Sequence, residues 1–141
     1  MLGSMITRFL TFFFSILFVL TISPHKSNAI STDLPECVVI THCVREDFKV
    51  NDLENAFKKA TKIVSETART KIIEKTDLFI HAEAKTKWRR YTDDLLLKAI
   101  PEKGIIQVRS ESRVGIGDNG VNQKRVDDLA YRLMTERDIT N

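Results

Sequence analysis

The sequence predicts an α+β fold: a small antiparallel sheet of about four strands with two amphipathic helices packed on one face. Three observations support this prediction. Apolar stripes with helical spacing lie at both ends of the region after residue 50, two-residue periodicity lies between them, and the region is long enough for one domain only. We therefore divide the chain into a signal peptide at 1–29, an N-terminal arm with a cysteine pair at 30–50 and a single α+β domain at 51–141.

The first 29 residues have the organisation of a secretory signal peptide. Arg8 precedes the apolar run 9–23, Pro24 follows it, and Ser27 and Ala29 are small residues at the third and first positions before the expected cleavage point. An uncleaved membrane anchor is the alternative, although the run has only about 15 residues where a spanning helix needs roughly 20. We expect an exported protein, located in the periplasm or, in a photosynthetic source, in the thylakoid lumen.

Export removes most of the basic character of the chain. Arg8 and Lys26 lie in the first 29 residues and no acid does, so 20 basic and 19 acidic residues remain, a net charge of +1. Net charge therefore gives no indication of a surface for polyanions, and we expect no nucleic-acid partner.

The arm at 30–50 is expected to be extended and to precede the first regular element, although the β-branched segment 38–42 could form a strand. Its cysteines, Cys37 and Cys43, favour a disulfide in an exported protein. A metal site that includes His42 and a free or redox-active pair are the alternatives. The first helix is predicted to start at Asn51, which forms a capping-box pattern with Glu54, followed by a single apolar stripe of Leu53, Ala56, Phe57, Ala60, Ile63 and Val64.

Segments with two-residue periodicity predict two hairpins, 70–75 with 78–85 and 91–100 with 105–112. The second connection has Pro101 early and Gly104 late, which is typical of a tight turn. A final helix is predicted over about 122–136 from an apolar stripe of Val126, Leu129, Ala130, Leu133 and Met134.

The tight turn of the second hairpin predicts which residues face each other, because opposite residue numbers then sum to 205. One face would carry the pairs Ala99 with Ile106, Leu97 with Val108, Leu95 with Ser110, and Asp93 with Ser112. This apolar face ends in a carboxylate, and a carboxylate at the edge of a core must be paired. We expect Asp93 to find its partners among Ser110, Ser112 and residues 113–125. The other face, with Asp94 diagonal to two arginines, is expected to be solvated or half-covered.

The segment 91–126 resembles the C-terminal part of the family known as domain of unknown function 1499, which occurs in bacteria, cyanobacteria and chloroplasts. The matching residues are Asp93-Asp94, Arg109-Ser110-Glu111-Ser112-Arg113, Gly115, Asp118, Gly120, Asn122 and Arg125. The family also opens with two cysteines five residues apart, similar to Cys37 and Cys43-Val44, although Arg45-Glu46 stand where serines are usual. The resemblance implies a shared fold over nearly all of the chain after residue 29, and it implies no activity.

The segment from Arg109 to Arg125 is the first candidate site. Its glycines let backbone N–H groups converge, the following helix adds positive potential at its start, and its arginines can contact phosphate or carboxylate. The candidate ligand-binding residues are Asp93, Arg109, Ser110, Ser112, Arg113, Gly115, Asp118, Gly120, Asn122 and Arg125. The interpretation that we favour over a binding site is a structural joint, in which Asp118 or Asn122 caps the helix and the arginines are neutralised by Asp93, Asp94, Glu111 or Asp128.

The second candidate site is a run of cations and aromatic side chains, Trp88, Arg89, Arg90 and Tyr91. This mixture is typical of a peripheral membrane contact or a partner contact. A solvated turn that leads into a strand is the interpretation that we favour. No catalytic residue, metal site or cofactor is predicted, because only two histidines remain after residue 29 and neither is near Ser110 or Ser112 in sequence.

The sequence therefore favours a non-catalytic binding or assembly module that acts at or near a membrane complex. Its partner would be a protein or a small anionic ligand. The alternative is a small anionic-ligand-binding domain or a hydrolase that uses Asp93, Ser112 and Arg113.

Overall fold

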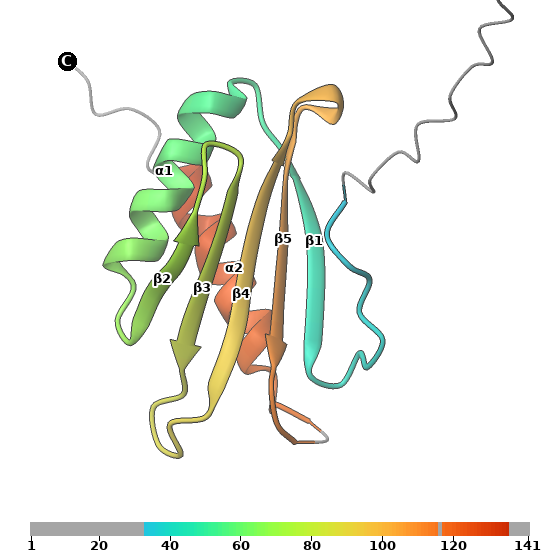
Figure 1. Ribbon diagram of the computed structural model, residues 1–141, viewed down its shortest axis with the longest axis vertical. Helices are drawn as coiled ribbons and strands as arrows, with labels where there is room; N and C mark the ends of the chain where they lie inside the picture. Colours follow the sequence, from blue (N-terminus) through green and yellow to red (C-terminus); the bar gives the residue numbers. More distant parts are fainter. Residues whose placement is uncertain (1–32, 116, 136–141) are drawn as a thin grey trace, which may run out of the picture.

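The computed structural model describes residues 33–115 and 117–135, so the predicted signal peptide lies outside the described residues. Within them the chain forms a five-stranded antiparallel sheet and two α-helices (Figure 1), which confirms the α+β class. The elements are β1 (Cys43–Lys49), α1 (Leu53–Glu66), β2 (Thr70–Lys75), β3 (Phe79–Lys85), β4 (Thr92–Ile100), the 3-10 turn η1 (Pro101–Lys103), β5 (Ile105–Ser112) and α2 (Val121–Thr135). The strand order is β1-β5-β4-β3-β2.

The additional strand is β1, which corrects the prediction of an arm that extends to residue 50. It pairs with β5 along its whole length, from Cys43 opposite Glu111 to Lys49 opposite Ile105. The sequence of β1 has only a weak strand pattern. Val44 and Phe48 are its only large apolar residues, and Glu46 lies between them on the same face. Its pairing depends on the backbone of β5, which is distant in sequence. The β-branched segment 38–42 forms a turn instead of a strand.

The β4–β5 hairpin has the predicted register. All four predicted pairs are present, including Asp93 opposite Ser112 and Leu97 opposite Val108. Gly104 closes the turn in the left-handed region, with φ of 63°, and its N–H donates to the carbonyl of Pro101. A residue with a side chain would be strained at this position. The first hairpin also forms, with a register shift between Ile72 and Glu74.

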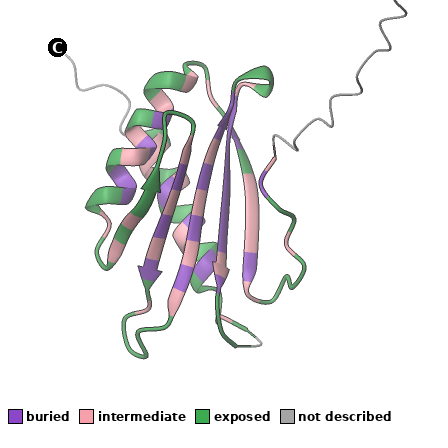
Figure 2. Ribbon diagram, viewed as in Figure 1, coloured by how far each residue is buried: buried purple, intermediate pink, exposed green. Residues whose placement is uncertain are grey.

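Both helices lie behind the sheet in Figure 1, and they contribute to one buried core. The core cluster combines Phe57 and Ile63 of α1 and Val126 of α2 with strand residues such as Ile80 and Leu97. Figure 2 shows burial that alternates along β4, as expected for a strand with one face on the core. The core therefore lies on the face of the sheet where Asp93 was expected.

The helix ends differ slightly from the prediction. Asp52, not Asn51, is the N-cap of α1, since its carboxylate accepts the N–H of Asn55 at 3.1 Å. A carboxylate at this place also lies favourably in the helix dipole. Met134 belongs to the predicted apolar stripe of α2, but its side chain is exposed, whereas the adjacent Leu133 packs against the core.

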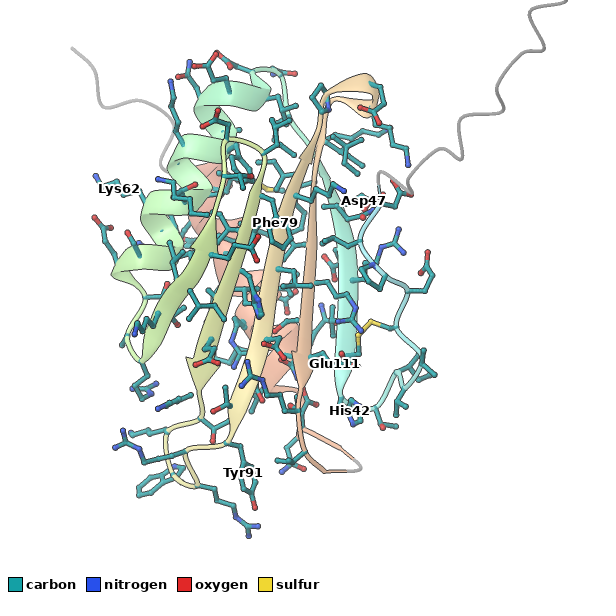
Figure 3. The ribbon with its side chains drawn as sticks, viewed as in Figure 1. His42, Asp47, Lys62, Phe79, Tyr91 and Glu111 are labelled. Atoms are coloured by element: carbon teal, nitrogen blue, oxygen red, sulfur yellow. A yellow bond between two sulfur atoms is a disulfide. The ribbon has the colours of Figure 1, made fainter. Side chains whose placement is uncertain are left out.

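The arm residues 33–42 run beside β1 (Figure 3), and Leu34 of the arm contacts Gln107 on the outer face of β5, the face away from the helices. The N–H of Leu34 donates to the side chain of Gln107 at 2.5 Å, and Asp33 accepts from Lys103 at 2.6 Å. Gln107 and Arg109 are consequently buried, whereas Leu96 and Lys98 of β4 on the same face are partly exposed, so the face is half-covered, one of the two expected states. A disulfide joins Cys37 and Cys43 and closes the turn between them. No helix among the described residues has the length and apolar character needed to cross a membrane.

We expect the double variant Cys37→Ala/Cys43→Ala to lower the free energy of unfolding by about 2 kcal/mol, because the disulfide restricts a short loop in the unfolded chain. Urea unfolding followed by circular dichroism measures this change. Wild-type protein in reductant should have the same urea midpoint of unfolding as the double variant. An unchanged midpoint in reductant would contradict the expectation.

Candidate functional site

A cleft with a volume of about 840 Å³ opens between the helices and one end of the sheet. This is the end at which β3 and β5 finish and β4 begins. The end of α1, the loop between β3 and β4, the loop between β5 and α2, and one side of α2 form its walls. Residues of both candidate sites of the sequence therefore contribute to the same cleft.

Asp93 lies at the floor of this cleft. It is the residue of β4 at which the apolar row ends, and it has no exposed surface. Arg125 of α2 donates from Nη2 to Asp93 Oδ2 at 2.6 Å, forming an ion pair with little solvent access. The other carboxylate oxygen, Oδ1, is buried and accepts no hydrogen bond from the described residues. A buried carboxylate oxygen normally has a donor, so Asp93 retains an unused acceptor at the cleft floor.

A polar network lies beneath the ion pair and joins β5, α2 and the arm. Asn122 is its centre: the side-chain oxygen accepts from Ser110 at 2.6 Å and from Arg125 at 2.5 Å. The side-chain nitrogen donates to Ser112 Oγ and to the carbonyl of His42, both at 2.9 Å. All hydrogen-bonding positions of this buried amide are occupied, so Asn122 is a structural joint and has no capacity left for a ligand.

The start of α2 is occupied by the carboxylate of Asp118. It accepts from the N–H of Gly120 at 2.9 Å and from the N–H of Asn122 at 2.7 Å. Burial raises the pKa of Asp118, but these two N–H groups outweigh burial and the pKa lies below its usual value. The left-handed conformation of Gly120, with φ of 75°, turns the chain into the helix. The helix N-terminus that was predicted to bind an anion thus binds an anion of its own chain.

Two of the predicted arginines lie on the outer face of the sheet, away from the cleft. Arg113 contacts Asp94 at 2.8 and 2.9 Å and Glu83 at 2.7 Å, and Arg109 is paired with Glu111 at 2.7 Å. Asp93, Ser112 and Arg113 therefore do not form one site. The hydrogen bond from Arg113 holds the pKa of Asp94 below its usual value, with a smaller contribution from the hydrogen bond of the neighbouring histidine.

The mouth of the cleft carries the aromatic and cationic residues. Trp88 is 86 % exposed with Lys87 Nζ 5.2 Å from its ring centre, and Arg89 donates to Tyr91 Oη at 3.4 Å. Sequence reasoning missed several lining residues, which lie on the turn after α1 and on the outer turns of α2: Thr67, Arg69, Lys124, Tyr131 and Arg132. No local signal could have identified them, because they reach the cleft only when both helices are packed on the sheet.

Residues 20–133 match the family model described as "Protein of unknown function (DUF1499)". The chain belongs to this family. The match covers every strand and nearly all of α2, so the cleft and its floor lie within the shared region. It confirms the resemblance inferred from the second hairpin and the cysteines. The comparison with curated proteins gives no match, and the activity of this DUF1499 protein has to be argued from the site itself.

The floor of the cleft gives a stability prediction for this DUF1499 chain. Asp93→Asn should lower the free energy of unfolding by about 3 to 5 kcal/mol, because the substitution leaves the largely buried Arg125 without its partner charge. Asp94→Asn, the adjacent residue on the outer face, is the matched control and should cost only about 1 kcal/mol. Urea unfolding at neutral pH measures both. Equal losses in the two variants would show that the buried ion pair contributes no more to the free energy of unfolding than the ion pair on the outer face.

The lowered pKa of Asp94 predicts a pH dependence. Because the folded protein holds the deprotonated form, Asp94 stabilises the fold above its unfolded pKa, and this contribution is lost as the pH falls through the lower folded pKa. The difference in unfolding free energy between the wild type and Asp94→Asn should be constant above about pH 5 and shrink below about pH 4. Both proteins should carry His81→Gln, so that ionisation of this histidine does not contribute. A difference in unfolding free energy that stays constant down to pH 2 would contradict the lowered pKa of Asp94.

Proposed function

We propose that this protein is a non-catalytic binding module whose cleft takes up a small amphipathic anion. The observation that carries the proposal is the charge balance of the cleft lining. Its four acids are all engaged, by cations or by backbone N–H groups: Glu66, Asp93, Asp118 and Asp128. Four of its cations form no ion pair within the described residues: Arg69, Lys85, Lys87 and Arg89. The mouth therefore carries uncompensated positive charge.

The remaining walls fit the rest of such a ligand. Side chains of Val114 and Val121 provide exposed apolar surface, and Trp88 and Tyr131 add aromatic rings. The volume of about 840 Å³ lies within the range of about 300–1,000 Å³ that holds small molecules. A hydroxyl or N–H group at the inner end of the ligand would satisfy Asp93 Oδ1. The ligand class that fits is an amphiphile with a donor at one end and an anionic group at the other.

Binding without catalysis agrees with the surroundings of the hydroxyl groups. Ser110 and Ser112 have their oxygens in the Asn122 network. Neither described histidine is hydrogen-bonded to a serine: His81 donates to Asp94 on the outer face, and His42 donates to the carbonyl of Gly115. A serine nucleophile needs a base within hydrogen-bond reach, and the cleft supplies none of this kind.

The location of the binding event is part of the proposal. The N-terminal segment favours export, and the module would then act at or near a membrane complex in the periplasm or the thylakoid lumen. Support for this location comes from the sequence pattern of residues 1–29.

The amphipathic anion 8-anilino-1-naphthalenesulfonate is a suitable probe. It should bind saturably with increased fluorescence, and Arg69→Glu/Lys85→Glu should weaken binding by about tenfold per charge, the ratio that corresponds to about 1.4 kcal/mol. The matched control is a pair of reversals outside the cleft, Lys71→Glu/Lys98→Glu, which should leave the affinity within about twofold. Equal weakening by both pairs, or binding that does not saturate, would refute the cleft as the site.

A further inference from the structure

Three loops meet at the end of the sheet that carries the cleft mouth. They are the disulfide-closed turn 38–42, the β3–β4 loop 86–91 and the described part of the β5–α2 connection, 113–115 and 117–120. Backbone hydrogen bonds connect the β5–α2 connection to its neighbours: the N–H of Asp118 donates to the carbonyl of Thr41, and that of Arg113 to the carbonyl of Thr92, the residue of β4 that follows the β3–β4 loop. Figure 3 places the labelled residues His42 and Tyr91 at this same end. We call this region the loop end.

The loop end carries the most exposed large apolar side chains among the described residues. Val38 is 90 %, Trp88 86 % and Ile40 82 % exposed. Tyr91 and Val114 add partly exposed apolar surface to the same end. Such residues occur singly on most protein surfaces, but here they project from the tips of all three loops. Exposed apolar side chains on three neighbouring loops indicate one contact surface.

The loop end is also positively charged. The β3–β4 loop carries Lys87, Arg89 and Arg90 and no acid. None of these three cations forms an ion pair within the described residues, since Lys87 stacks on the Trp88 ring and Arg89 contacts a tyrosine hydroxyl. The nearby acids are already held, with Asp94 and Glu83 bound to Arg113 and Asp118 bound to the start of α2. The complementary surface must be anionic.

We propose that the loop end docks on an anionic lipid membrane. Trp88, Val38 and Ile40 enter the interfacial layer of the bilayer, where aromatic rings and aliphatic tips are favourable. Lys87, Arg89 and Arg90 lie with their aliphatic stems along the same layer and their charges at the anionic headgroups. A bilayer fits this surface better than a protein does, because separate tips can insert into a fluid layer whereas a folded partner needs one continuous matching face.

This inference goes beyond the proposed function, because it does not need the cleft to hold a ligand. It does give the cleft an orientation. Lys87, Trp88 and Arg89 belong to both the cleft lining and the loop end, so docking directs the cleft mouth to the membrane surface. An amphipathic ligand could then pass between the bilayer and the cleft without crossing water.

The single tryptophan of the chain reports docking directly. Trp88 is the only one, and the apolar run 9–23 has none, so the full chain can be used without a background signal from its N-terminal segment. With vesicles of phosphatidylcholine and phosphatidylglycerol, we expect the emission of Trp88 to shift to shorter wavelength and to be quenched by lipids brominated on the acyl chains. Vesicles of phosphatidylcholine alone should produce neither effect at physiological salt.

The triple variant Lys87→Ala/Arg89→Ala/Arg90→Ala should lower the affinity for anionic vesicles by about fivefold for each cation, about a hundredfold in total. The matched control removes the same charge at exposed positions outside the loop end and the cleft: Lys49→Ala/Lys58→Ala/Lys75→Ala. It should retain wild-type quenching, reduced by at most a few-fold through the change in net charge.

The variant Val38→Ser/Ile40→Ser separates docking from occupation of the cleft, since neither residue lines the cleft. It should lose most of the quenching by brominated lipids and still bind 8-anilino-1-naphthalenesulfonate as the wild type does. Absence of quenching on anionic vesicles overturns the proposal, as does an equal loss in the control triple variant. A wavelength shift without quenching also overturns the proposal. Such a shift would report an amphiphile in the cleft or a protein contact, and not insertion of Trp88 into the bilayer.

Discussion

The ion pair between Asp93 and Arg125 is the interaction on which the rest of this structure depends. It joins the end of the apolar row of β4 to the second turn of α2, and so it sets where α2 lies on the sheet. A buried carboxylate without a cation would be costly in a core of this size. Both residues of the pair line the cleft, so the pair also forms part of its floor.

The polar network around Asn122 extends this constraint to the arm. The amide connects two serines of β5 with the carbonyl of His42, next to the disulfide. The disulfide turn, the start of α2 and the end of β5 therefore form one rigid joint beneath the cleft floor. Such a joint is a suitable support for a binding surface. The loops that it carries are already fixed in relation to each other, so they lose little conformational entropy on binding.

The two faces of the sheet differ in how their charges are balanced. On the outer face, acids and cations neutralise each other, as in the group formed by Asp94, Arg113 and Glu83. On the helix face, the acids of the cleft are bound by cations or by backbone N–H groups, and four cations of its lining form no ion pair within the described residues. Charge is thus nearly balanced over the chain after residue 29 and unbalanced at one end of it, which explains why net charge gave no sign of the positively charged cleft mouth.

The sequence by itself determined the α+β class, both hairpins, the register of β4 against β5, and the position of Asp93 at the end of an apolar row. These features depend on periodicity and on one tight turn, which act over a few residues. Only the tertiary structure decided that β1 is a strand, that Arg125 and not Arg113 pairs with Asp93, and that the Trp88 loop shares a cleft with α2. Each of these joins segments that are distant along the chain, and their meeting is fixed by backbone pairing and core packing, which no local pattern records.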